Sequence, residues 1–160
     1  MPPFNLHTPE FVYDPQDPEG YRAGMARLGP DIGATRLGGT VYELPPGQSI
    51  CPYHFEYGDE EWLILLDGRA TLRRPQGEEE VGPGDVVCFP AGPDGAHKVT
   101  NRTGGPCHVL MLSTKHDPAI AAYPDSDKVG VFPGGGDEGL LFRRKDAVDY
   151  YEGEGEPRQG

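Results

Sequence analysis

The stretch that decides the predicted fold is residues 47–68, GQSICPYHFEYGDEEWLILLDG. It begins at a glycine and ends with an apolar run that stops at Asp67-Gly68. This Asp-Gly dipeptide supplies the positive φ angles that a tight two-residue hairpin needs. The stretch therefore predicts one β-strand before the acidic segment 59–61, a second strand after it, and a hairpin turn that leads into a third.

A two-residue turn at Asp67-Gly68 also predicts the register of that hairpin. Leu63 then faces Leu72, and Glu61 faces Arg74. Because side chains alternate along a strand, these four share one face, whose middle is apolar and should point inward. The side chain of Glu61 is then expected to point into the interior at the open end of the fold, with Arg74 opposite.

Short β-like runs and turn signals continue along the rest of the 160 residues. Glycine (24 residues) and proline (18) together make about a quarter of the chain and recur between these runs, as turns do in all-β folds. No long segment has a helical period, and residues 119–123 are assigned to a single helical turn. The predicted strands are residues 40–44, 49–56, 61–66, 70–74, 85–89, 98–101 and 107–114. The sequence therefore predicts an all-β sandwich or barrel.

One domain suits this length. Residues 1–36 are rich in proline, glycine and charge, and are predicted to form an irregular arm. Residues 37–146 form the β domain, with extension strands within 128–144. Residues 147–160 are read as a loose, acidic, solubilising tail.

Composition excludes several classes of function. The net charge of −12, from 14 basic and 26 acidic residues, argues against nucleic-acid binding, which needs a basic surplus. Apolar runs are far too short for a membrane span. The first residues lack the basic start and apolar core of a signal peptide, and the three cysteines do not form a disulfide framework. We expect a reduced, cytoplasmic protein.

Two histidines and two glutamates are the candidates for chemistry. His54 and Glu56 are two residues apart, so on a strand they project to the same side. Glu61 starts the next strand on the inward face, and His97 opens a later strand. Imidazole and carboxylate groups held on rigid strands suit a divalent metal such as manganese, iron, zinc or nickel.

The spacing of these residues resembles the first motif of the cupin superfamily. That motif runs Gly, five residues, His-x-His, three or four residues, Glu, six residues, Gly. Here six residues separate Gly47 from His54, and four separate Glu56 from Glu61. Six more lead to Gly68. The departure that matters is Glu56, which stands where the common pattern has its second histidine.

Residues 84–101 resemble the second cupin motif. Gly84 is followed after five residues by Pro-x-Gly at 90–92, then by His97 and, after three intervening residues, by Asn101. The gap before His97 is four residues where two are usual. The two motifs cover about 55 residues in the right order, which makes the resemblance specific.

The resemblance implies a double-stranded β-helix, the jelly-roll barrel of cupins, with a homodimer whose N-terminal strands cross between subunits. It carries the metal ligands over to His54, Glu61 and His97, with Glu56 as a substituted fourth ligand. Two alternatives for Glu56 stay open: it is a general base beside a three-ligand metal, or the substitution leaves the site empty.

Two functions follow from this reading. The first is a metal-dependent enzyme of isomerase, dioxygenase or hydrolase type that acts on a small polar molecule. The second is a non-catalytic cupin that binds or senses a small ligand. Inward polar groups beyond the four candidates would favour catalysis. Arg74 could anchor an anionic substrate, or it could form a rim salt bridge with Glu61 or Glu80.

Four other residues carry structural expectations. Cys88 and Cys107 lie in strand-like runs and are expected to be small buried side chains. Cys51 lies three residues before His54 and should point away from the ligands. Asn101 should form hydrogen bonds to strand ends and turns.

Overall fold

The computed structural model describes residues 2–135 and 138–155, which form a β-rich body with one short α-helix, α1 (Leu28–Ile32). Short 3-10 turns lie at Pro93–Gly95, Pro124–Ser126, Pro133–Gly135 and Arg144–Asp146. The strands are β1 (Gly24–Arg27), β2 (Leu37–Leu44), β3 (Phe55–Glu56), β4 (Glu61–Asp67), β5 (Ala70–Arg74), β6 (Gly77–Val81), β7 (Val86–Phe89), β8 (Lys98–Thr100), β9 (Cys107–Thr114), β10 (Ala119–Tyr123), β11 (Lys128–Phe132) and β12 (Leu140–Arg143).

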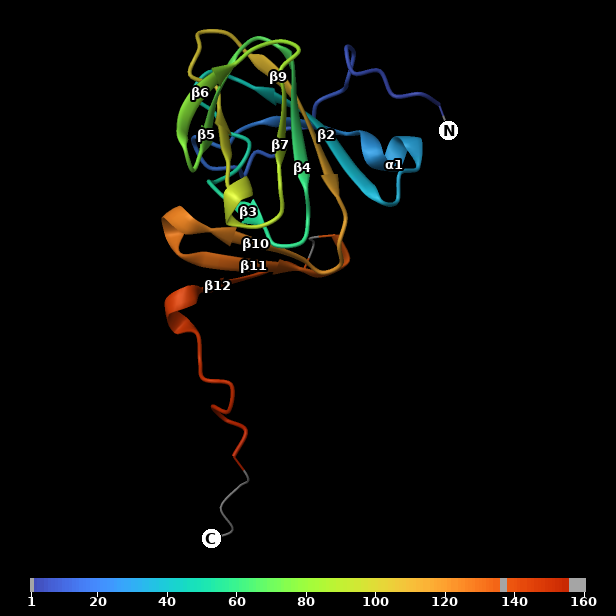
Figure 1. Ribbon diagram of the computed structural model, residues 1–160. Coiled ribbons are helices and arrows are strands. Elements are labelled where there is room, and N and C mark those ends of the chain that lie inside the picture. The colour runs from blue at the N-terminus through green and yellow to red at the C-terminus, as the bar shows by residue number, and fades with distance from the viewer. Residues whose placement is uncertain (1, 136–137, 156–160) are drawn as a thin grey trace.

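These strands form three antiparallel sheets. The largest has the order β1-β2-β9-β4-β7, the smallest the order β6-β5-β8, and the third the order β12-β11-β10-β3. The strands β10, β11 and β12 lie across one end of the other two sheets (Figure 1). The predicted all-β class is confirmed.

The main core lies between the five-stranded and three-stranded sheets. Leu63 of β4 and Leu72 of β5 are both fully buried, and they belong to one apolar cluster. Val109 of β9 and Val99 of β8 join them with 0% and 1% exposure. Period-two alternation on each strand therefore places one apolar row of each sheet against the other.

The predicted hairpin register is wrong. Strand β4 pairs with β7 and β9, whereas β5 pairs with β6 and β8, so the turn at Asp67-Gly68 carries the chain from one sheet to the other. The inward faces were nevertheless assigned correctly, because strands that face each other across a core bury the same alternating residues as strands that pair side by side.

Other elements also differ from the predictions. Residues 119–123 form strand β10, which pairs with β11 and β3 and buries the adjacent Ala121 and Ala122. Burial of neighbouring residues removes the alternation that identifies a strand. Of the predicted strand 49–56, only β3 and single bridges at Ser49 and His54 form. Strand β6 was not predicted.

The arm of residues 1–36 is not wholly irregular. It contains β1, which pairs with β2, and α1. Phe4, Leu6 and Phe11 pack against a buried group on the five-stranded sheet that includes Val41 and Leu110. The arm therefore covers part of this sheet in its own chain.

The C-terminal segment 147–155 extends away from the body (Figure 1). Its aromatic residues Tyr150 and Tyr151 are 86% and 75% exposed. The last five residues of the predicted tail lie outside the described residues. Among the described residues, none of the helices has the length and apolar character needed to cross a membrane.

Candidate metal centre

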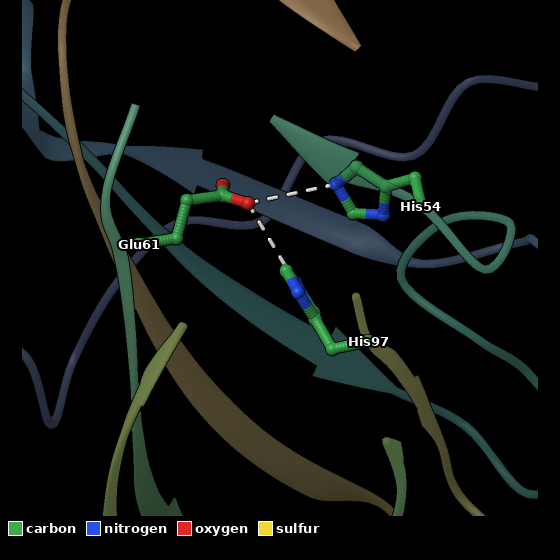
Figure 2. Close-up of side chains that lie close together, drawn as sticks. All are labelled: His54, Glu61 and His97. Carbon is green, nitrogen blue, oxygen red and sulfur yellow. Dashed lines mark ion pairs between the residues drawn. The ribbon is translucent and has the colours of Figure 1, made fainter. Parts of the chain in front are cut away.

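His54, Glu61 and His97 come together from three separate segments (Figure 2). The Oε2 atom of Glu61 lies 3.6 Å from His54 Nε2 and 3.7 Å from His97 Nε2. One nitrogen or oxygen atom from each residue lies within 4.8 Å of the other two. Glu61 is the first residue of β4, while His54 and His97 immediately precede β3 and β8. The fold thus gathers three of the four predicted ligands.

A backbone bridge fixes the spacing of the two histidines. The His54 amide donates to the His97 carbonyl at 3.1 Å, and the His97 amide donates to the His54 carbonyl at 2.8 Å. The turn before His97 requires glycine at 95, because a Cβ atom there would lie 1.8 Å from the Pro90 carbonyl oxygen. This close approach lets the chain turn tightly just before the histidine.

Backbone carbonyls also fix the orientation of both rings. Nδ1 of His54 lies 3.0 Å from the carbonyl oxygen of Pro52, and Nδ1 of His97 lies 2.9 Å from that of Gly95. An Nδ1–H that donates to a carbonyl leaves the lone pair on Nε2. In both rings, Nε2 is the nitrogen nearest the Glu61 carboxylate. Histidine ligands of protein-bound metals are commonly held in this way.

The pKa values of the two imidazoles are shifted in opposite directions. Burial, helped by the neighbouring His54, lowers the pKa of His97 to about 4, so its ring is neutral at pH 7. Burial also acts to lower the pKa of His54, but contacts with Cys51 and Glu61 outweigh it and raise that pKa. A neutral His97 presents a free lone pair, as metal ligation requires, whereas His54 with its raised pKa is protonated in the metal-free site and would release a proton on binding a metal.

The residues present fit a divalent metal. Nε2 of His97 is buried and has no hydrogen-bond partner among the described residues, which is costly for a polar atom. Two imidazole nitrogens and one carboxylate oxygen form a donor set common for zinc, iron or manganese. Three protein ligands leave coordination positions open for water or substrate.

Glu56 lies beside this group rather than within it. Its Oε2 atom is buried without a hydrogen-bond partner among the described residues. Burial, with a contribution from the negative charge of Glu61, raises the pKa of Glu56 to about 7. Glu56 is not one of the three grouped residues, and its role as fourth ligand stays a prediction. A carboxyl group with this pKa can donate or accept a proton near neutrality.

A cavity of about 680 Å³ adjoins the three-residue group. Glu56 and Glu61 both line it, and so does Tyr123, whose ring stacks on His54 with 6.0 Å between centroids. Burial raises the pKa of Tyr123 to about 12, so its hydroxyl stays protonated. Further polar side chains at the wall are Thr35, Asp59, Ser113, Thr114, Lys115, His116 and Asp117.

Arg74 does not face Glu61. It lies at the end of β5, where its guanidinium pairs with Glu79 of β6. The anticipated rim salt bridge therefore exists with a different partner, and Arg74 is not among the residues that line the cavity. A role of Arg74 in substrate binding stays a prediction.

Two expectations about cysteines were wrong. Cys51 does not point away from the ligands, since its Sγ lies 3.4 Å from His54 Nδ1. Cys88 is exposed, because its side of β7 is the outer face of the sheet, whereas Cys107 is buried as predicted. The alternation argument failed at Cys51 because the segment before His54 is not a regular strand.

The hydrogen-bonding role predicted for Asn101 is confirmed. Its Nδ2 donates to the carbonyl oxygens of Leu44 and Gly105, and its Oδ1 accepts from Thr103. Sequence reasoning missed Asp59 and His116, which hydrogen-bond to each other at the cavity wall. Asp59 lies in the variable gap of the first motif and His116 follows β9, so no spacing singled them out.

Comparison with known proteins identifies the class. Residues 40–113 match the family described as Cupin domain. This part of the chain is a cupin domain, as the motifs predict.

Solved structures give the individual likenesses. A sugar phosphate isomerase of the cupin superfamily from Silicibacter pomeroyi is 25% identical, with a TM-score of 0.79 over 94% of this chain and 98% of that chain. A putative sugar phosphate isomerase from Acidithiobacillus ferrooxidans is 25% identical, with a TM-score of 0.73 over 81% of both chains. The polyketide cyclase RemF from Streptomyces resistomycificus is 27% identical, with a TM-score of 0.60 over 74% and 83%. No curated protein matches the chain in sequence.

Proposed function

We propose that this cupin is a metal-dependent isomerase of small hydroxy-carbonyl compounds. His54, Glu61 and His97 would hold the divalent metal, and the substrate would occupy the adjoining cavity. The observation that carries the proposal is the buried Nε2 of His97, which has no partner among the described residues and faces Glu61 at 3.7 Å. A metal ion would satisfy this nitrogen.

Glu56 supplies the proton transfer in this proposal. The bound metal would polarise the substrate carbonyl, which makes the hydrogen on the neighbouring carbon more acidic. Glu56 takes that proton and returns it to the former carbonyl carbon. Its pKa of about 7 suits both directions, because a group is most effective when its pKa lies near the operating pH.

Two observations favour this reaction class. The similar structures from Silicibacter and Acidithiobacillus are both described as sugar phosphate isomerases. The cavity is also lined by polar side chains other than the proposed ligands and Glu56, among them Asp59, His116 and Tyr123. A non-catalytic binding or sensing cupin, the alternative, has less need of such groups.

Elemental analysis tests the metal site. Protein purified without tag or chelator should contain a divalent metal in near-stoichiometric amount, and the His54→Ala/His97→Ala variant should contain almost none. His7→Ala, which changes an exposed histidine of the arm, is the matched control and should keep its metal. Wild-type protein that stays metal-free even after reloading would overturn the enzyme proposal and leave the sensing alternative.

The Glu56→Gln variant separates base from ligand. As a base, Glu56 can be replaced with little change in metal affinity, while isomerase activity falls by about 10²–10⁴-fold. As a ligand, its replacement should weaken metal binding by about 10-fold or more. Isothermal titration with the native metal, beside an activity assay, distinguishes the two.

A further inference from the structure

A second group capable of proton transfer lies at the wall of the same cavity. His116 follows β9, and its Nδ1 lies 2.7 Å from Oδ1 of Asp59. The same oxygen accepts a hydrogen bond from the Thr114 hydroxyl at 2.9 Å. The Asp59 side chain is only 8% exposed, whereas that of His116 is 62% exposed. A buried carboxylate thus holds an accessible imidazole.

This arrangement determines which ring nitrogen is free. Because Nδ1–H donates to Asp59, the neutral ring carries its lone pair on Nε2. Gly58 lies against the ring, where a Cβ atom would be 3.5 Å from His116 Cγ. His116 is therefore oriented by hydrogen bonding on one nitrogen and available on the other, as a general acid or base requires.

Other wall residues are less suited to this role. Lys115 has no hydrogen-bonded partner among the described residues to orient it. Asp117 uses Oδ1 to accept from the Gly134 amide at 2.9 Å. His116 alone combines a buried orienting partner with an exposed ring, among the described residues that line the cavity.

We propose that His116, oriented by Asp59, is the second proton-transfer group of the isomerase and moves the proton between the two substrate oxygens. This inference rests on the proposed function. As Glu56 removes the proton from carbon, the protonated form of His116 donates its Nε2 proton to the carbonyl oxygen and becomes the neutral ring. It then accepts the proton of the neighbouring hydroxyl, whose carbon becomes the new carbonyl, while Glu56 returns its proton to the former carbonyl carbon. Atoms and electrons balance without an oxidant.

The substrate class follows from this division of work. Two groups that move protons, one at carbon and one at oxygen, suit a compound with a carbonyl next to a hydroxyl-bearing carbon, such as an aldose or a ketose. The same experiment shows whether the substrate must also carry a phosphate group. The probes are glucose, fructose, glucose 6-phosphate and fructose 6-phosphate, each incubated with metal-loaded protein in D₂O.

Two rates are measured, deuterium incorporation at carbon and conversion of aldose to ketose. The His116→Gln variant should lose conversion by about 100-fold or more. It should keep a larger share of carbon exchange, because Glu56 still removes that proton. The ratio of exchange to conversion should therefore rise. Asp59→Asn should change the ratio in the same direction, and Glu56→Gln should lose exchange. His7→Gln is the matched control and should match wild type.

The outcomes separate the inference from the function on which it rests. Wild-type protein with neither exchange nor conversion on any probe overturns the isomerase proposal, and the role of His116 with it. Active wild type with an unchanged His116→Gln variant overturns only the role of His116. Equal loss of both rates, or loss of bound metal by elemental analysis, means that His116 acts structurally, which also overturns the inference.

Discussion

Asn101 shows how a single polar side chain holds several segments together. It is fully buried, and its amide nitrogen binds the carbonyl oxygens of Leu44 and Gly105 at 2.7 and 2.8 Å. Asn101→Ala removes these bonds and deprives the buried Leu44 carbonyl of its side-chain donor, so it should lower the free energy of unfolding by about 1–3 kcal/mol. Urea denaturation measures this.

Asn5→Ala is the matched control for that substitution. Asn5 is exposed, and its side chain accepts a local hydrogen bond from the amide of His7. Its replacement should change stability by less than about 0.5 kcal/mol. If the two substitutions lower the free energy of unfolding equally, the buried hydrogen bonds of Asn101 stabilise the protein no more than an exposed one does.

At the residue scale, motif spacing predicted more of the site than strand geometry did. The six-residue gap to Gly68 selects Glu61 over Glu60, and Glu61 is the one that meets the histidines, while Glu60 is exposed and accepts from Trp62. Motif spacing could not predict that the side chains of Cys51 and His116 lie near the site. Their positions depend on irregular backbone, which has no fixed period from which a side chain's direction follows.

The turn between β4 and β5 depends on glycine at 68. Its φ of +76° is one that other residues adopt at a cost, and a Cβ atom there would lie 2.7 Å from Cys107 Cβ. Gly68→Ala should therefore destabilise the protein by about 1–3 kcal/mol, measured as a lower midpoint of urea unfolding. Gly104→Ala, at a site with nothing within 4 Å, should be close to neutral.

The same turn shows why element pairing was harder to predict than element existence. An Asp-Gly dipeptide identifies a tight turn from local backbone preferences alone. Whether the flanking strands then pair or separate depends on distant partners, here β9 for β4 and β8 for β5. Those partners lie more than 20 residues away in sequence, and nothing in residues 61–74 indicates them.

At the scale of the whole molecule, the homodimer implied by the cupin resemblance stays a prediction. Light scattering should give a mass of about twice 17.4 kDa. Deletion of residues 1–10 leaves β1 in place but removes Phe4 and Leu6, which pack on the five-stranded sheet. If the arm also crosses to a second subunit, this deletion should shift the mass toward the single chain. A full-length protein with the single-chain mass contradicts the prediction.

Metal binding should stabilise the whole molecule, because the three ligands join its three sheets. His54 precedes β3 of one sheet, Glu61 begins β4 of another, and His97 precedes β8 of the third. A ligand that binds only the folded state at about 100 times its Kd adds about 2.7 kcal/mol. For a domain of this size, that amount raises Tm by roughly 5–10 °C.

The main apolar cluster contains none of the three ligands, so the metal-free protein should still fold and give a measurable Tm. Calorimetry with chelator and with added metal measures the difference. The His54→Ala/His97→Ala variant separates site binding from general salt effects, because it should melt at one temperature under both conditions. If wild type shows no difference, or if the variant shows the same one, the metal does not bind between the sheets. The unpaired Nε2 of His97 would then lower the stability of the folded protein, with no metal to compensate.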